Sequence, residues 1–274
     1  MGFNYHSYLR EKMMPHIWCS GCTHGIVTKA LIRAIDKAKF DKNKVVVVSG
    51  IGCASRMPGY LDFNTLHTTH GRALAFATGV KLANPELHVI VVAGDGDAVA
   101  IGGNHFIHSC NRNIDMTLVV LNNNIYGMTG GQRSPTTLEG DISSTSVYGS
   151  IGNPIDVVNL AIGAGATFVA RTTTYHVHQL ESYIYSGLMH KGFSVIDAVS
   201  ACYTAYGRRN KQRYKSAIDM LNYMKNNVVN ISAAREMNSE ELKGKIIIGI
   251  FKDSLEPEYC EEYQKMINRV KNKT

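Results

Sequence analysis

Five short apolar runs alternate with longer amphipathic segments along most of the chain. The runs are rich in Val and Ile and cover residues 44–49, 87–93, 116–121, 167–170 and 193–198. Apolar runs of this length are typical of parallel strands that are buried on both faces. The segments between them have the apolar spacing of helices and cover 25–39, 71–82, 104–111, 154–162 and 176–191. This alternation predicts βαβ units and an α/β fold with a doubly wound, mostly parallel sheet.

The pattern changes after about residue 207. The chain becomes basic and helical, then has a strand-like run at 245–251 and a final amphipathic helix. We expect residues 1–207 to form the core and residues 208–274 to form a basic C-terminal extension that packs on the core or on a partner subunit. Within the core, residues 128–151 are rich in Gly, Thr and Ser and have no clear period. A loop of that length inside a compact domain is usually functional.

Composition and charge narrow the class of protein. The 274 residues are 45% hydrophobic, which is enough for a sizeable core. No run is long enough to cross a membrane, and the start lacks the basic and apolar parts of a secretory signal. We therefore expect a cytoplasmic protein with reduced thiols. The net charge is +7, but the basic residues are scattered and no nucleic-acid-binding motif is present.

The densest basic cluster permits two interpretations. It could be a solvated helix face, or a docking patch for an acidic partner or an anionic substrate. Its members are Arg208, Arg209, Lys211, Arg213 and Lys215.

Polar residues follow two neighbouring runs of the predicted sheet. Asp95 follows the second run, in a Gly-Asp-Gly-Asp-Ala stretch, and Asn123 follows the third. Because the carboxyl ends of parallel strands meet at one edge of a sheet, we expect these side chains to lie close together. Together with the carbonyl of Ile125 they offer the hard oxygen donors that Mg²⁺ prefers when it also holds phosphates. Gly94 and Gly96 would let backbone N–H groups approach a diphosphate.

The interval between these motifs resembles a known fingerprint. A Gly-Asp-Gly triplet followed at this distance, 28 residues from Asp95 to Asn123, by paired asparagines resembles the thiamine-diphosphate motif. The triplet alone is a weak signal, because Gly and Asp are common in turns. Two interpretations of Asp97 stay open. Its backbone could contact the cofactor, or its side chain could be the N-cap of a helix that begins at Ala98.

Cysteines form a second group of candidate residues. Cys19 and Cys22 form a CxxC motif, Cys53 follows the first predicted strand and Cys202 follows the last. The parallel topology places Cys53 and Cys202 at the edge that carries Asp95. Four thiolates suit an iron–sulfur cluster or structural zinc, although zinc sites usually have two compact CxxC pairs. A single CxxC could also be a redox dithiol. The remaining cysteines are expected to be ordinary buried or surface thiols: Cys110 and Cys260.

Taken together, the motifs resemble the β subunit of 2-oxoacid:ferredoxin oxidoreductases over roughly residues 15–205. The resemblance rests on the CxxC element, in which Ser20 stands where the family commonly has proline. It also rests on the elements Ile51-Gly52-Cys53, His70-Gly71-Arg72, Gly94-Asp95-Gly96-Asp97-Ala98 and Asn123-Asn124-Ile125-Tyr126-Gly127-Met128-Thr129-Gly130-Gly131-Gln132.

The resemblance implies specific ligands for each cofactor. A [4Fe–4S] cluster would be held by Cys19, Cys22, Cys53 and Cys202. Mg²⁺ would be held by Asp95, Asn123 and the carbonyl of Ile125. Thiamine diphosphate would be contacted by Ile51, Gly52, Cys53, Ala54, His70, Gly94, Gly96, Asp97, Gly127, Met128 and Thr129.

It also implies an activity and partners. The expected reaction is oxidative decarboxylation of a 2-oxoacid, with coenzyme A as co-substrate and one-electron transfer to the cluster. An α subunit would supply the pyrimidine-binding domain and the activating glutamate, because this chain is too short to contain both halves. The chain alone is therefore expected to be inactive. The electrons would leave to a ferredoxin-like carrier, and further small subunits are compatible with the family.

The substrate is expected to be 2-oxoglutarate. Arg56 could pair with its second carboxylate, and His70 is the other candidate catalytic residue. Alternatively, Arg56 binds a cofactor phosphate or a carboxylate of another subunit. Three other functions stay open from sequence: a different 2-oxoacid such as pyruvate, a non-redox thiamine-dependent decarboxylase, and a non-catalytic iron–sulfur or zinc protein.

Overall fold

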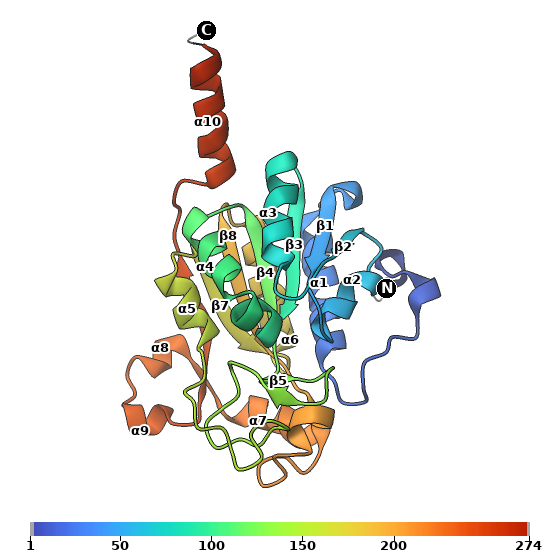
Figure 1. Cartoon of the computed structure of the whole chain (residues 1–274), viewed down its shortest axis with the longest axis vertical. Coiled ribbons are helices and arrows are strands. Elements are labelled where there is room, and N and C mark those ends of the chain that lie inside the picture. Colours follow the sequence, from blue (N-terminus) through green and yellow to red (C-terminus); the bar gives the residue numbers. More distant parts are fainter. Residues whose placement is uncertain (1–2, 273–274) are drawn as a thin grey trace.

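A single mixed sheet organises the chain. The computed structural model describes residues 3–272. Eight strands lie in the order β2-β1-β3-β4-β8-β7-β10-β9, and all neighbours are parallel except β7 and β10 (Figure 1). The strands are β1 (Val45–Ser49), β2 (Asn64–His67), β3 (His88–Gly94), β4 (Met116–Asn122), β7 (Phe168–Thr173), β8 (Phe193–Val199), β9 (Val228–Asn230) and β10 (Ile246–Asp253). A separate hairpin joins β5 (Ile125–Tyr126) to β6 (Gln132–Arg133).

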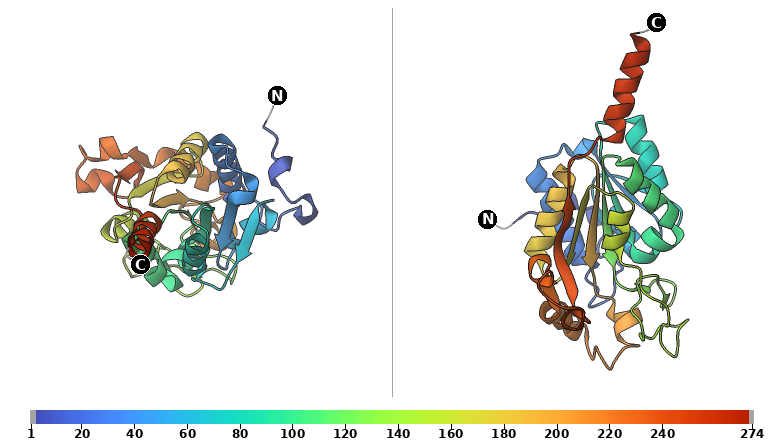
Figure 2. Two further views of the ribbon diagram at one scale, coloured as in Figure 1. Left: turned by 90° about the horizontal axis from the view of Figure 1, so that it is seen from above. Right: turned by 90° about the vertical axis from the view of Figure 1, so that its left-hand side faces the viewer.

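Helices cover both faces of this sheet (Figure 2). One face is covered by α3 (Ala73–Ala83), α4 (Gly103–Arg112) and α5 (Val157–Gly163), and the other by α1 (His24–Ala38) and α6 (Val177–Met189). The remaining helices are α2 (Met57–Tyr60), α7 (Ala217–Asn226), α8 (Ile231–Ala234), α9 (Ser239–Leu242) and α10 (Tyr259–Lys271). The arrangement is the doubly wound α/β fold predicted from the sequence.

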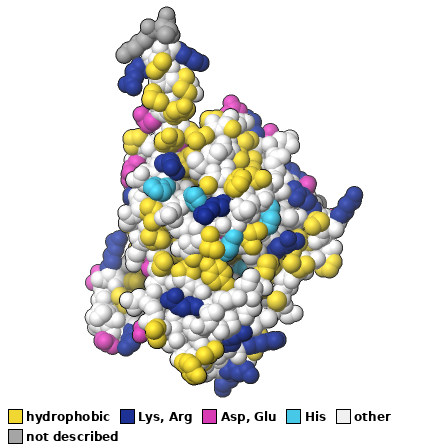
Figure 3. All heavy atoms as spheres, in the orientation of Figure 1, with side chains coloured by type: hydrophobic (Ala, Val, Ile, Leu, Met, Phe, Trp, Pro, Cys, Tyr) yellow, Lys and Arg dark blue, Asp and Glu magenta, His cyan; other side chains and the backbone are white. Residues whose placement is uncertain are grey.

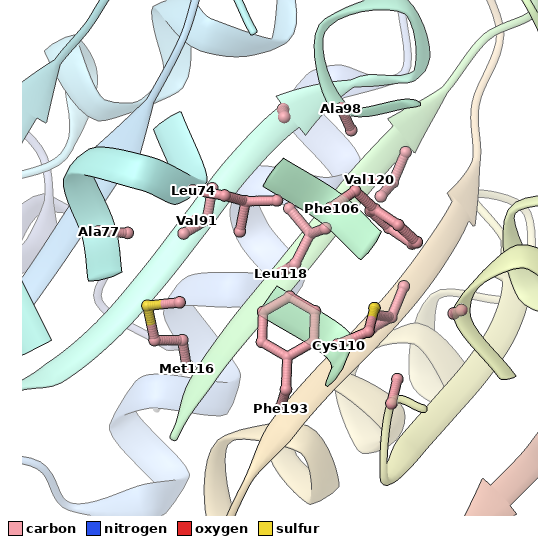
Figure 4. Close-up of a cluster of buried hydrophobic side chains, with 14 of the residues drawn as sticks. Leu74, Ala77, Val91, Ala98, Phe106, Cys110, Met116, Leu118, Val120 and Phe193 are labelled. Carbon is pink, nitrogen blue, oxygen red and sulfur yellow. The ribbon is translucent and has the colours of Figure 1, made fainter. Parts of the chain in front are cut away.

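Alternating side chains of the central strands fill two hydrophobic layers. In β4, Leu118 and Val120 point to the layer under α3 and α4, whereas Val119 and Leu121 point to the layer under α1 and α6. Figure 4 shows the first layer, where Leu118 lies among side chains of the sheet and the helices, Phe106 of α4 included. Both layers are almost completely excluded from solvent, so the central strands are rigid supports for the loops at their carboxyl ends.

The predicted elements match the structure closely. All five predicted strands and five predicted helices are present, with ends that differ by at most three residues. The sequence pattern missed β2, because this edge strand (Asn64–His67) has polar, partly exposed residues and pairs only with β1. The helical interpretation of the basic cluster is wrong: residues 208–216 form turns, and α7 begins at Ala217.

The C-terminal residues extend the same sheet. β10 pairs with β7 in an antiparallel manner, and β9 pairs with β10. α10 then projects away from the body of the molecule (Figures 1 and 2). No helix in residues 3–272 is both long and apolar enough to cross a membrane.

Candidate functional site

The loops that carry the candidate residues leave the same edge of the sheet. The ends of β3 and β4 lie side by side, with Gly94 opposite Leu121. The ends of β4 and β8 also lie side by side, with Asn122 opposite Val199. Two adjacent cavities are formed where the loops after β1, β3, β4 and β8 meet. We call them the GDG cavity and the cysteine cavity.

The GDG cavity contains every residue that the sequence assigned to thiamine diphosphate or Mg²⁺. Its lining is Ile51, Gly52, Cys53, Ala54, His70, Gly94, Asp95, Gly96, Asp97, Asn123, Ile125, Gly127, Met128 and Thr129, together with His24 and Tyr126. Asp95 and Gly96 begin the helical segment that follows β3, so their N–H groups belong to a helix start. Backbone donors at a helix start favour anions such as phosphates.

Asp95 is buried and is held by the long loop after β6. The hydroxyl of Thr136 donates to Asp95 Oδ2 over 2.6 Å. Burial raises the pKa of the Asp95 carboxyl to about 6, because the ionised form loses its hydration. A divalent cation would favour the ionised carboxylate. The amide oxygen of Asn123 accepts one hydrogen bond, from the N–H of Ile125 at 3.2 Å, which leaves acceptor capacity on that oxygen. These donors fit Mg²⁺.

Asp97 joins three loops through its buried carboxylate. Oδ1 accepts hydrogen bonds from Nδ1 of His70 (2.6 Å), from the N–H of Gly71 (2.7 Å) and from the N–H of Ile51 (3.3 Å). Oδ2 accepts from the hydroxyl of Ser55 at 3.4 Å. The N-cap interpretation is wrong: Asp97 lies inside the helical segment, and its carboxylate accepts hydrogen bonds from other loops instead of from its own helix. His70 lines the GDG cavity, so its contact with Asp97 fixes the imidazole ring beside that space.

Tyr126 closes one side of the GDG cavity. Its hydroxyl donates to the carbonyl of Gly96 at 3.0 Å, and its ring meets the edge of the His70 ring at 6.0 Å between centroids. A Cβ at position 96 would lie 2.2 Å from the Tyr126 ring. Glycine at position 96 is therefore required by the close approach of this ring.

The cysteine cavity brings together the four predicted cluster ligands. Its lining is Ile17, Trp18, Cys19, Cys22, His24, Cys53, Arg56, Asn123, Gly127, Met128, Cys202, Tyr203, Thr204 and Ala205. Five of these residues also line the GDG cavity: His24, Cys53, Asn123, Gly127 and Met128. The two cavities therefore share a wall.

Hydrogen bonds position the three segments that carry these cysteines. The indole N–H of Trp18 donates to the carbonyl of Cys53 at 2.8 Å. The hydroxyl of Thr23 accepts from the N–H of Ala201 at 2.8 Å, which connects the CxxC element to the loop of Cys202. Neither hydrogen bond involves a sulfur atom. The polypeptide itself therefore arranges the thiols.

Burial disfavours the charged thiolate form of three of the four cysteines. Burial raises the pKa of Cys22 to about 12 and that of Cys53 to about 11, and it also raises the pKa of Cys202. The backbone N–H of His24 points to the Cys22 sulfur, and those of Ala205 and Tyr206 point to the Cys202 sulfur; these contacts lower the thiol pKa values only partly. Metal binding would replace the thiol protons and release them.

Three residues of the site were missed by the sequence patterns. His24 is 1% exposed, and among the described residues neither ring nitrogen has a hydrogen-bond partner. It lines both cavities, and burial lowers its pKa to about 4. The other two are Tyr126, which belongs to the family element after Asn123 but had no role assigned, and Thr136, which no pattern marked. His24 stands two residues after the CxxC element and begins α1.

The two remaining cysteines, Cys110 and Cys260, are buried in the core, as expected for ordinary thiols. Arg56 lines the cysteine cavity, and its buried Nε has no hydrogen-bond partner within residues 3–272. A larger cavity, about 300 Å³, lies near Arg171 and contains none of the predicted site residues.

Known proteins share both the fold and the sequence of this chain. Residues 50–198 match the family "Thiamine pyrophosphate enzyme, C-terminal TPP binding domain". The 2-oxoglutarate synthase subunit KorB of Methanocaldococcus jannaschii is 52% identical over 97% of this chain and 97% of its own. The KorB subunit of Archaeoglobus fulgidus is 52% identical over 97% of this chain and 95% of its own. The 2-oxoacid:ferredoxin oxidoreductase β subunit from Sulfolobus is 38% identical over 89% of this chain and 84% of its own.

A solved structure agrees with these relatives. The 2-oxoglutarate:ferredoxin oxidoreductase from Magnetococcus marinus, with 2-oxoglutarate, coenzyme A and succinyl-CoA bound, superposes with a TM-score of 0.86 and 32% identity. The match covers 98% of this chain and 91% of that chain. Fold, cavity lining and full-length identity thus agree, and the chain belongs to the family of 2-oxoacid:ferredoxin oxidoreductase β subunits, with a thiamine pyrophosphate-binding domain at residues 50–198.

Proposed function

We propose that this chain is the cofactor-binding β subunit of a 2-oxoglutarate:ferredoxin oxidoreductase. The complete enzyme would convert 2-oxoglutarate and coenzyme A to succinyl-CoA and CO₂, with two electrons transferred one at a time to a carrier. The observation that carries this proposal is the wall shared by the GDG cavity and the cysteine cavity. When bound, thiamine diphosphate would supply the electron sink for decarboxylation. The KorB relatives and the ligands named for the Magnetococcus enzyme support 2-oxoglutarate as substrate.

The GDG cavity would hold the diphosphate and its metal. Asp95, Asn123 and the carbonyl of Ile125 would bind Mg²⁺, and the N–H groups around Gly96 would donate to phosphate oxygens. Thr136 orients the metal-binding carboxylate from outside the cavity. The protein's contribution is therefore a fixed set of donors that needs little rearrangement when the cofactor binds.

The cysteine cavity would hold a [4Fe–4S] cluster. All four sulfur-bearing residues line one cavity. The 2-oxoacid:ferredoxin oxidoreductase relatives favour a cluster over zinc, because zinc has no redox chemistry and could not pass electrons to a carrier. Thiol ligands suit the reducing cytoplasm that we propose for this protein.

Iron analysis tests the cluster directly. Anaerobically purified protein should be brown and contain about four iron atoms per chain. Replacing Cys202 with Ser should remove most of the iron and the visible absorbance. Cys260→Ser is the matched control, because Cys260 is buried outside both cavities. A colourless wild-type protein that contains zinc would refute the cluster.

The site requires a partner chain to be complete. Large apolar side chains remain exposed at the GDG cavity, where Ile51 is 39% exposed and Met128 is 46% exposed. We propose that an α subunit covers them and supplies the pyrimidine-binding domain with its glutamate. Residues 1–207 would hold the cofactors, and residues 208–274 would pack on this core or on a partner. The assay is 2-oxoglutarate-dependent dye reduction with and without the α subunit. Turnover by the isolated chain would contradict the proposal.

Arg56 is the proposed substrate-selecting residue. Arg56 lines the cysteine cavity and has an unpartnered Nε, so its guanidinium would donate hydrogen bonds to a second substrate carboxylate. Arg56→Leu should raise KM for 2-oxoglutarate at least tenfold more than KM for pyruvate, since about 1.5–3 kcal/mol is expected for a charged hydrogen bond. Arg56→Lys should restore part of the difference. Equal effects on both substrates would instead favour binding of a cofactor phosphate or a subunit carboxylate.

A further inference from the structure

The cysteine cavity opens beside a group of basic side chains that the cofactor site does not use. They belong to the turns of residues 208–216, which follow Cys202 and the π-helical turn Tyr203–Gly207. Residues 203–218 contain no Asp or Glu. Figure 1 places this segment at the lower end of the molecule, and Figure 3 shows several Lys or Arg side chains at that end.

The five basic residues of this segment have two different roles. Arg209 donates to the carbonyls of Ala205 (2.8 Å) and Gly130 (3.1 Å), and Arg213 forms an ion pair with buried Asp141 at 2.9 Å. These two side chains are bound within the fold and shape the turns. The other three form no ion pair with any acidic residue in the described part of the chain: Arg208, Lys211 and Lys215. Their positive charge is directed to solvent without compensation.

Tyr203 connects this charge to the cysteine cavity. Its side chain lines the cavity, its ring lies 5.7 Å from the Arg208 guanidinium, and its hydroxyl donates to the carbonyl of Lys215 at 2.8 Å. The CxxC loop packs on the same segment, because a Cβ at Gly21 would lie 2.5 Å from Cβ of Ala217. Arg208 and Lys215 are thus connected directly to the wall of the cavity that holds the four cysteines, and Lys211 lies between them in the chain.

An apolar side chain lies at the same opening. Ile17 is 64% exposed and lines the cysteine cavity together with Cys19, which is also exposed. An apolar centre with a charged rim is the usual composition of a protein–protein interface. Small, weak interfaces with strong electrostatic steering are typical of electron-transfer encounters.

We infer that Arg208, Lys211 and Lys215, together with Ile17 at the cavity, form the docking surface for an acidic one-electron carrier protein. The inference rests on the cluster proposed above. Oxidation of the substrate releases two electrons and a single cluster accepts one at a time, so each turnover reduces two carrier molecules. The basic rim would speed encounter with a negatively charged carrier and would orient it over the cysteine cavity.

The test uses the complete enzyme with its α subunit and a recombinant acidic ferredoxin as the probe. The variant is Lys211→Glu/Lys215→Glu, and the control is Arg235→Glu/Lys243→Glu, which makes the same charge change on exposed residues of the C-terminal extension. At low salt, kcat/KM for ferredoxin should fall at least tenfold in the first variant, and its dependence on ionic strength should weaken. The control should change kcat/KM less than twofold.

Reduction of the enzyme's own iron by 2-oxoacid and coenzyme A, followed by absorbance without a carrier, separates the two proposals. Unchanged reduction in the docking variant, combined with the tenfold loss toward ferredoxin, supports the docking surface. If the docking variant and the control reduce ferredoxin equally well at every ionic strength, the docking surface is refuted although the cluster stands. If wild-type protein shows no iron-based absorbance change, the proposed function itself fails.

Discussion

Asp97→Asn is expected to destabilise the protein by loosening three loops at once. The Asp97 carboxylate is buried and receives two short hydrogen bonds, from Nδ1 of His70 at 2.6 Å and from the N–H of Gly71 at 2.7 Å. A charge-assisted hydrogen bond contributes about 1.5–3 kcal/mol. A neutral acceptor retains roughly half of that. Loss of the charge at two such bonds should therefore cost about 1.5–3 kcal/mol.

Urea denaturation of the isolated chain measures this cost as a change in the free energy of unfolding. Glu86→Gln is the control, because within residues 3–272 this exposed carboxylate pairs with Lys44 alone. The control should leave the midpoint of unfolding unchanged. A double-mutant cycle with His70→Ala should give a coupling energy of at least about 0.5 kcal/mol. If Asp97→Asn is as stable as the wild type or more stable, the carboxylate is buried at a net cost and does not hold the loops together.

Three further substitutions test separate parts of the structure. Thr136→Val removes the hydroxyl that orients Asp95, and it should weaken Mg²⁺-dependent binding of thiamine diphosphate about tenfold, as measured by calorimetry. Gly96→Ala should also weaken this binding because its Cβ meets the Tyr126 ring, and adding Tyr126→Ala should recover part of the affinity. Leu118→Ala should lower the free energy of unfolding by about 2–5 kcal/mol in urea denaturation, because Leu118 is completely buried.

Sequence reasoning was most successful where strand topology alone determines position. Asp95, Asn123, Cys53 and Cys202 follow buried parallel strands, so the direction of the sheet brings them to one edge whatever the loops do. The family and fold predictions are confirmed by the relatives and by the sheet order. The roles of the individual residues stay predictions.

The sequence was least informative where tertiary contacts decide the role of a side chain. Asp97 has the local pattern of an N-cap, yet its carboxylate is drawn to the donors of two other loops. Arg209 and Arg213 look like solvated charges in a basic run, but Arg209 donates to two backbone carbonyls and Arg213 pairs with buried Asp141. β2 has a single apolar residue, Leu66, because it is an edge strand that pairs only with β1 and is partly exposed. In each case the decisive partner is distant in sequence and no period or motif reveals it.

The contacts around the cysteines indicate an order of assembly. Thr23–Ala201 and Trp18–Cys53 hydrogen bonds hold together segments that are up to 178 residues apart, and neither uses a sulfur atom. The fold can therefore form before iron arrives, unlike small zinc domains whose folding requires metal. The isolated chain without iron should consequently keep its native circular dichroism and a cooperative unfolding transition. Loss of that transition on iron removal would show that the cluster, and not the backbone contacts, holds the three segments together.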